Sequence, residues 1–288
     1  MEMKREEPPV ELRTVLARID NISSLPTIPH VLLEINKMLE KADASNKKMQ
    51  NVIEKDQVIT AKILKLVNSS FYGFRSKIVD ISQALLILGF NTVRNSIATV
   101  AIIDIFRTKD KFDSFDIRDL WRHSLAVAIT SRRLAETARM APPSDCFVAG
   151  LIHDLGKLIM VEHLPTLFDR VLKFKREEAI SFVEAERKIL PITHAGIGAH
   201  LIRKWRFPSR LVDAVEHHHQ VTRTASDFWL HVCVYAANTI VNHQFRESGN
   251  EEIMQAFPGY SSIMPLLGDF KEWHLAVEEE IDKLCQAF

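Results

Sequence analysis

A histidine followed directly by an aspartate lies inside an apolar run of the sequence, at His153 and Asp154. Burying an imidazole beside a carboxylate costs free energy unless another group satisfies both. A divalent metal ion does so, because neutral imidazole and carboxylate are both good ligands of first-row metals. The alternative is a buried ion pair or a helix cap without a metal. Two residues supply only half of a coordination shell, so a metal site needs further ligands from elsewhere in the chain.

Histidines that could complete such a shell lie on both sides of the pair. His123 lies upstream, on the face of a predicted helix that also carries the apolar residues. His194 lies downstream, near the predicted start of another helix, and three consecutive histidines occupy 217–219. Only two of the three can face inward from one helical turn, and their position in a predicted helix over 208–219 favours His218 and His219. Each of these histidines also has an explanation without a metal. His123 could be an ordinary core histidine, and His194 could bond a carbonyl at the start of its helix. The histidines at 217–219 could be cations at a solvated helix end.

Lys157 follows the pair by three positions. As a compact positive charge it could balance a bound phosphate, which makes it the candidate catalytic residue. The alternative is a solvated surface lysine. Gly156 precedes it and would allow another backbone to approach closely.

The elements that must position these residues are predicted to be helices throughout. Apolar residues recur at helical spacing, and there are only nine glycines in 288 residues. Asp80 is predicted to begin a helix that Gly89 ends, and Ser181 to begin another. Ser144 or Asp145 is predicted to cap the helix that carries His153 and Asp154.

The composition excludes several classes of protein. Lysine plus arginine and aspartate plus glutamate balance at 37 each, so no general surface for nucleic acid or anionic membranes is expected. The three cysteines are far apart, which is typical of reduced thiols in a cytoplasmic protein. The longest apolar stretch, around 97–106, is too short to span a bilayer, and no signal peptide is expected.

The order of the candidate ligands resembles that of the HD superfamily of metal-dependent phosphohydrolases. Three N-terminal segments are similar to the HDOD domain, the HD-related output domain of bacterial signalling proteins: LPTIP at 25–29, LVNSSFYG at 66–73 and ISQALLILG at 81–89. The resemblance covers roughly residues 22 to 240. It implies an all-α fold, in which an HD-like helical bundle packs against an N-terminal helical bundle. Such domains are usually regulatory, and many have lost the HD catalytic ligands.

With the resemblance, the chain divides into three parts. Residues 1–21 form an N-terminal lead, 22–115 the N-terminal helical bundle, and 116–288 an HD-like subdomain with a C-terminal helix. The charged stretch 107–115 breaks the apolar pattern and marks the boundary. Because no long flexible linker joins the two bundles, we expect them to share a core and to unfold together.

The sequence departs from the HD pattern at two places. Asn238 stands where a late helix should supply an aspartate that closes the metal shell. An amide oxygen can coordinate a metal, but it brings no negative charge and cannot act as a base. The Gly-Tyr-Pro segment that follows the paired histidines in cyclic-dinucleotide phosphodiesterases is also absent after His219. Both departures argue against catalysis.

Two functions from different classes remain. The favoured one is a signalling module that acts by binding a protein partner, with a partly retained metal site for iron, manganese, nickel or zinc. An apolar patch on the N-terminal bundle would receive the partner, with Phe71, Tyr72 and Phe74 as candidates. The alternative is a metal-dependent phosphohydrolase acting on a nucleotide, a cyclic dinucleotide or another phosphorylated small molecule. Whether the protein is an enzyme stays open at this point.

Overall fold

The computed structural model describes residues 11–21, 30–69, 72–74, 76–107, 115–139, 141–220, 227–242 and 270–287. All regular elements in these ranges are helices, which confirms the all-α prediction. The helices are α1 (Leu12–Asp20), α2 (His30–Glu40), α3 (Asn46–Glu54), α4 (Gln57–Val67), α5 (Ile81–Arg107), α6 (Ile117–Ala138), α7 (Pro143–Ile152), α8 (Leu155–His163), α9 (Pro165–Glu178), α10 (Phe182–Ile189), α11 (His194–Lys204), α12 (Ser209–Glu216), α13 (Phe228–Asn242) and α16 (Phe270–Ala287).

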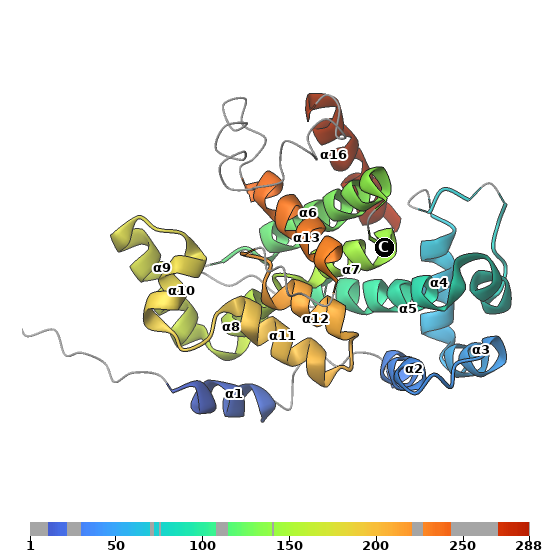
Figure 1. Cartoon of the computed structure of the whole chain (residues 1–288), viewed down its shortest axis with the longest axis horizontal. Helices are drawn as coiled ribbons and strands as arrows, with labels where there is room; N and C mark the ends of the chain where they lie inside the picture. Colours follow the sequence, from blue (N-terminus) through green and yellow to red (C-terminus); the bar gives the residue numbers. More distant parts are fainter. Residues whose placement is uncertain are drawn as a thin grey trace, which may run out of the picture.

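The N-terminal bundle consists of α2, α3 and α4 packed against α5 (Figure 1). Short polar side chains begin its helices, because their oxygens accept the backbone N–H groups that the first turn leaves unpaired. Asp56 accepts from the N–H of Ile59 at 2.9 Å, and Asp80 accepts from the N–H of Gln83 at 2.7 Å. Gly89 breaks α5 with φ +77° and ψ 168°, so two helical segments meet there as the sequence predicts.

In the second half, α6 and α7 lie against each other, and α13 and α16 cover α6 (Figure 1). The close approach of α6 and α7 requires Gly150, since a Cβ at this position would lie 2.7 Å from the Cα of Ala128. Ion pairs of Arg122 with Glu278 and of Arg132 with Glu280 hold α16 on α6. This packing fixes α6 and α7, the two helices that lead to the first candidate ligands.

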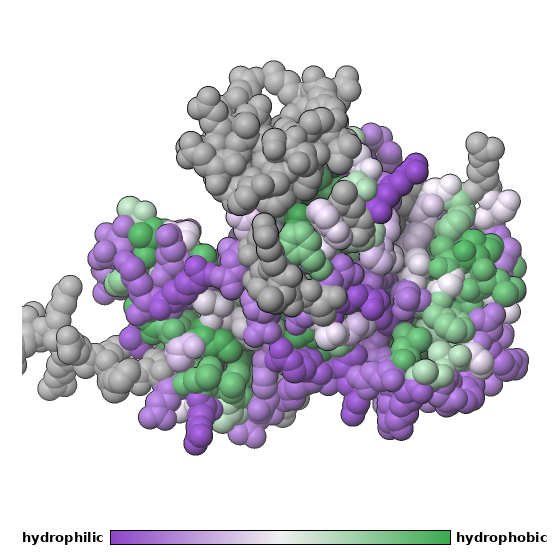
Figure 2. Space-filling model, in the orientation of Figure 1, coloured by the Kyte–Doolittle hydropathy of each residue, from purple (hydrophilic) through white to green (hydrophobic). Residues whose placement is uncertain are grey.

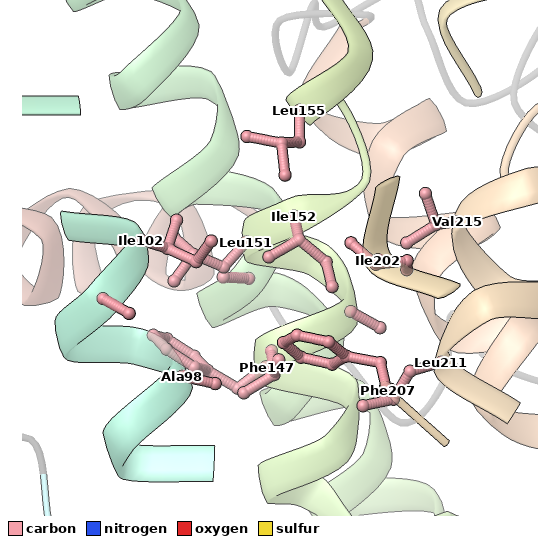
Figure 3. Packing of buried hydrophobic residues seen from close by; sticks show 14 of the residues in the cluster. Ala98, Ile102, Phe147, Leu151, Ile152, Leu155, Ile202, Phe207, Leu211 and Val215 are labelled. Atoms are coloured by element: carbon pink, nitrogen blue, oxygen red, sulfur yellow. The ribbon is translucent and has the colours of Figure 1, made fainter. Parts of the chain in front are cut away.

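One apolar core runs through both halves. Figure 3 shows Ala98 and Ile102 of α5 facing Phe147 and Leu151 of α7, with Ile202, Leu211 and Val215 of α11 and α12 on the far side. By length and composition α5 could cross a membrane, but 61% of its apolar window is buried inside the protein, as in a core helix. The shared core is the arrangement expected if the two halves unfold together, although the domain boundary itself stays a prediction.

The sequence was misleading about two helix ends. Neither Ser144 nor Asp145 caps α7, because the helix begins at Pro143, and Pro142 at the capping position makes no side-chain bond. The carboxylate of Asp145 instead forms ion pairs with Arg94 of α5, which is buried, and with Arg210 of α12, which is partly exposed. The helix predicted over 208–219 is α12, which ends at Glu216, so the three histidines lie in the turn that follows.

Other local predictions are confirmed or fall outside the described residues. Ser181 and Glu184 form the capping box of α10, each side chain accepting from the backbone N–H of the other. The expected C-terminal helix is α16, and the N-terminal lead contains the short helix α1. Residues 108–114, which make up most of the charged boundary stretch, and Phe71 are outside the described residues.

Candidate metal centre

The His-Asp pair lies at the break between two helices. His153 follows the last residue of α7, and Asp154 precedes the first residue of α8. Because the chain turns between them, both side chains reach the same space, which one straight helix would not allow. Gly156 then lets α8 touch α11, since a Cβ there would lie 1.9 Å from the carbonyl oxygen of His194. This contact places His194, the first residue of α11, beside the pair.

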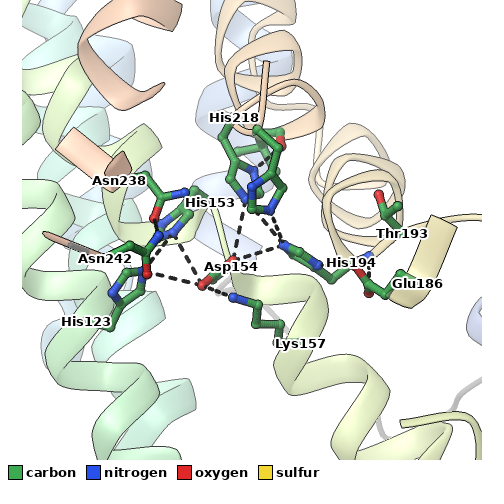
Figure 4. A network of polar contacts seen from close by, with 12 residues as sticks. His123, His153, Asp154, Lys157, Glu186, Thr193, His194, His218, Asn238 and Asn242 are labelled. Atoms are coloured by element: carbon green, nitrogen blue, oxygen red, sulfur yellow. Dashed lines mark hydrogen bonds and ion pairs between the residues drawn. The ribbon is translucent and has the colours of Figure 1, made fainter. Parts of the chain in front are cut away.

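The carboxylate of Asp154 lies between two groups of histidines (Figure 4). Its Oδ1 is 3.2 Å from Nε2 of His194 and 3.5 Å from Nε2 of His218. Its Oδ2 is 3.4 Å from Nε2 of His153 and 3.6 Å from Nε2 of His123. Within each group the candidate donor atoms lie within 4.8 Å of one another; the groups are Asp154 with His194, His218 and His219, and Asp154 with His123 and His153.

Three of the rings are fixed in one tautomer by their other nitrogen. Nδ1 of His153 donates to the carbonyl oxygen of Gly150, and Nδ1 of His218 to that of Val215, each at 2.7 Å. Nδ1 of His194 lies 2.6 Å from the carboxylate of Glu186. An acceptor at Nδ1 requires the proton there, so a neutral ring presents a bare lone pair at Nε2. All three lone pairs point toward Asp154.

The protonation states suit metal ligands. Burial lowers the pKa of His218 to about 3 and that of His123 to about 4, and it also lowers the pKa of His219. Burial alone would raise the pKa of Asp154, but His153 and Lys157 beside it hold that pKa well below its usual range. At neutral pH His123, His218 and His219 are therefore neutral imidazoles around an ionised carboxylate. For His194 the charge of Glu186 outweighs burial and raises the pKa.

Two features of the site call for a cation. Oδ1 of Asp154 is buried and accepts no hydrogen bond. Nε2 of His194 lies 3.3 Å from Nε2 of His218, and Nε2 of His123 lies 3.3 Å from Nε2 of His153. His194 and His218 both present a lone pair at Nε2, and these lone pairs repel each other unless a proton or a metal ion lies between them. Nε2 of His123 can instead carry a proton and donate it to His153. The donor set of imidazoles and one carboxylate fits a divalent transition metal.

Lys157 and Asn238 lie at the edge of this centre. Nζ of Lys157 is 2.6 Å from Oδ2 of Asp154, and the lysine side chain is 20% exposed. The side chain of Asn238 is hydrogen-bonded to His123, and its Oδ1 accepts from Nδ2 of Asn242 at 2.8 Å. The amide that replaces the expected carboxylate is thus part of the group formed with Oδ2 of Asp154.

All six predicted ligands and Lys157 therefore come together, while metal binding itself stays a prediction. His217 does not join them, because its ring donates to the carbonyl oxygen of Asp213. Glu186 was not predicted as part of the site, yet its carboxylate bonds both the ring and the backbone N–H of His194, at 2.6 and 2.7 Å. No local pattern marks Glu186, since it lies eight positions away on a different helix.

The model of the HDOD domain family matches residues 25–221 of the chain. An uncharacterized protein of Treponema pallidum is 23% identical over 88% of this chain and 50% of its own length. The uncharacterized protein YuxH of Bacillus subtilis is 32% identical over 51% of this chain and 37% of its own length. The chain thus spans half or less of these curated relatives.

Solved structures match over nearly the whole chain. An HDOD domain protein of unknown function from Geobacter sulfurreducens has a TM-score of 0.71 and 26% identity, covering 96% of this chain and 98% of that one. A candidate phosphohydrolase from Shewanella amazonensis has a TM-score of 0.68 and 20% identity, covering 94% and 98%. A candidate signal transduction protein from Marinobacter aquaeolei has a TM-score of 0.63 and 18% identity, covering 92% and 64%. The last two likenesses concern the fold alone.

Proposed function

Because the chain belongs to the HDOD domain family, we propose that it is a bacterial regulatory module that binds a divalent transition metal and signals through a protein partner. One observation supports the metal: the Nε2 lone pairs of His194 and His218 lie 3.2 and 3.5 Å from a buried carboxylate oxygen, Oδ1 of Asp154, that accepts no hydrogen bond. His194, His218 and His219 would hold an ion at Oδ1 of Asp154. His123 and His153 would hold a second at Oδ2. Iron, manganese, nickel and zinc all accept these donors.

Metal content of the purified protein tests this proposal. Wild type is expected to retain at least about one equivalent of transition metal after dialysis, and the double variant His153→Ala with Asp154→Ala much less. His217→Ala is the matched control, since His217 neighbours the ligands in sequence but bonds Asp213 instead. Equal metal in wild type and the double variant would reject the proposed site.

The surface proposed to contact the protein partner lies on the N-terminal bundle. Val79, Leu86 and Ile87 are 65%, 72% and 52% exposed. Figure 2 shows a large hydrophobic area at the end of the molecule where the N-terminal bundle lies. Tyr72, named from the sequence, is only partly exposed and its hydroxyl is bonded to Ser96 at 2.7 Å, whereas Phe74 is 39% exposed. The candidate contact surface is therefore Val79, Leu86 and Ile87 with Phe74.

A charge placed on this surface tests partner binding. Leu86→Glu is expected to keep the melting temperature and metal content of wild type, because the side chain has little contact to lose. Cross-linking in cells of the source bacterium should capture a protein with wild type that Leu86→Glu fails to capture. If wild type and Leu86→Glu capture the same proteins, this surface does not bind the partner. A loss of folding would instead assign Leu86 to the core.

A phosphohydrolase is the second candidate, favoured by Lys157. Its ammonium group lies beside the candidate metal position and is 20% exposed, so it could bind an oxygen of a phosphorylated substrate. A bound divalent metal would supply a water of lowered pKa and polarise a phosphoryl oxygen. Because Asn238 cannot take a proton from that water, we favour the function of a regulatory module over that of an enzyme.

Activity assays separate the two candidates. Phosphodiesterase and nucleotidase activity should be measured with added manganese, iron or nickel on wild type, on His153→Ala and on Asn238→Asp. We expect weak or no turnover in wild type. Robust wild-type turnover that His153→Ala abolishes would make the protein an enzyme.

A further inference from the structure

A buried polar network joins three helices at a distance from the metal centre. Asp145 of α7 is 1% exposed, and Arg94 of α5 is 2% exposed. Oδ1 of Asp145 accepts from Nδ2 of Asn95 at 2.7 Å and from Arg94 at 3.2 Å. Oδ2 accepts from Nε of Arg210 at 2.7 Å. One carboxylate therefore bonds α5 through one oxygen and α12 through the other.

Two of the helices joined by Asp145, α7 and α12, lead to candidate ligands. Asp145 lies in the first turn of α7, and His153 follows the last residue of that helix. Arg210 lies in the first turn of α12, and His218 comes two residues after its end. A helix of eight to ten residues is a rigid rod of roughly 12–15 Å. A bond between the starts of two such rods therefore constrains where their far ends meet.

The network also reaches the N-terminal bundle. Asn95 bonds both Asp145 and, at 3.1 Å, the hydroxyl of Ser144, so α5 is held against the start of α7 by two bonds from one amide. A cavity of about 270 Å³ borders the network and is lined by Asn95, Ser144 and Phe147 among others.

The burial of these charges makes the network sensitive to substitution. Burial lowers the pKa of Arg94 to about 10, and Asp145 partly offsets this effect. Without the carboxylate, two guanidinium groups would face each other with no anion between them. Arg94, which is 2% exposed, would be left as a buried charge without an anion, and α5 and α7 would have to move apart to let water reach it.

We propose that Asp145 is a positioning residue of the metal centre: it holds α7 and α12 so that Asp154 and His218 meet, and Asn95 ties this geometry to α5. The role of Asp145 toward the metal rests on the proposed function, whereas its role in aligning the two helices does not. A shift of the N-terminal bundle would then change metal affinity, which gives a partner bound there a route to the site.

The variants that test this proposal are Asp145→Asn and Arg210→Gln. Arg210 is 32% exposed, so its loss is tolerated even if Asp145→Asn fails to fold. The matched control is Asn68→Ala, because Asn68 makes two bonds to the backbone of Ile78 at 2.7 and 2.8 Å and none to the network. Melting temperatures of the metal-free proteins show whether the control is destabilised to a similar extent.

Titration with Co²⁺ provides the first readout, because its visible absorption reports ligand geometry. Arg210→Gln is expected to weaken Co²⁺ affinity at least about tenfold and to change the spectrum, as loss of outer-shell support does. Asn68→Ala is expected to keep both. Wild-type affinity and spectrum in Arg210→Gln would overturn the proposal.

Hydrogen exchange of the metal-free proteins provides a second readout that needs no metal. Exchange in the turn after α12, where the N–H of Gln220 bonds the carbonyl of His217 at 2.9 Å, should accelerate in Arg210→Gln and not in Asn68→Ala. If wild type binds no Co²⁺, the proposed metal-binding function is wrong. Hydrogen exchange then still tests whether Asp145 aligns α7 with α12. Unchanged exchange in Arg210→Gln would then reject the positioning role.

Discussion

Gly156→Ala tests how the contact between α8 and α11 builds the metal centre. The added Cβ would lie 1.9 Å from the carbonyl oxygen of His194 and 2.9 Å from the backbone nitrogen of Gly198, whereas real Cβ contacts are essentially never under 3.0 Å. Both obstacles are backbone, so no side chain can rotate away. The two helices must separate by about 1.1 Å or more to accommodate one methyl group.

The separation has two measurable consequences. Overpacking against backbone is expected to cost about 3 kcal/mol or more in free energy of unfolding, the upper end of the usual range. For a chain of this size, that cost lowers the melting temperature by roughly 6–12 °C. The distance between Oδ1 of Asp154 and Nε2 of His194, 3.2 Å in wild type, would increase, so the two atoms would no longer be placed to hold one ion. Metal affinity should therefore fall at least about tenfold.

Thermal unfolding of the metal-free protein and Co²⁺ titration measure the two effects. Gly196→Ala is the matched control on α11, because its Cβ would meet only the Ile192 side chain, at 2.7 and 3.0 Å, and that chain can rotate. We expect the control to lose about 1 kcal/mol or less. Wild-type stability and affinity in Gly156→Ala would refute the inference that this contact positions His194.

Three further predictions concern the charges and the shared core. Glu186→Gln is expected to lower metal affinity about 10–100-fold with little change in melting temperature, because Glu186 orients the ring of His194. An unchanged affinity in a Co²⁺ titration would contradict this role. Burial lowers the pKa of His123 to about 4 and that of His218 to about 3, from the ordinary value of 6.5, so the unfolded chain binds more protons below pH 6.5. The free energy of unfolding of the metal-free protein should then fall as pH drops from 6.5 toward 4, by up to about 1.4 kcal/mol per pH unit for each ring. If urea denaturation gave the same free energy at pH 7.5 and pH 5, these rings would not be buried in neutral form. Calorimetry should give one unfolding transition, because one core spans both halves, and two separated transitions would show that the bundles are independent.

Much of the fold could be predicted from the sequence because its signals are local. A cap or a capping box involves residues three positions apart, as at Asp56, Asp80 and Ser181, and all three begin helices in the structure. Gly89 breaks α5 because only glycine adopts its φ of +77° without strain. The helical period of the apolar residues likewise depends on near neighbours. These signals predict an all-helical chain.

The part of the candidate site that could be predicted from the sequence is the set of residues whose type alone indicates metal binding. Histidines beside an aspartate in an apolar run indicate metal ligands wherever the fold brings them together, and the order of His123, His153 and His194 resembles a known ligand order. Gly156 was likewise expected to allow a close approach, which the contact of α8 with α11 confirms.

Only the tertiary structure decided which distant residues meet. Asp145 is a predicted cap in the sequence, but the guanidinium groups of Arg94 and Arg210, 51 and 65 positions away, bind its carboxylate instead. Glu186 supports His194 from another helix, and no periodic signal links the two. The division of the histidines between the two oxygens of Asp154 depends on helix ends that pack against each other. Such contacts follow from the shape of the whole core, which no short stretch of sequence encodes.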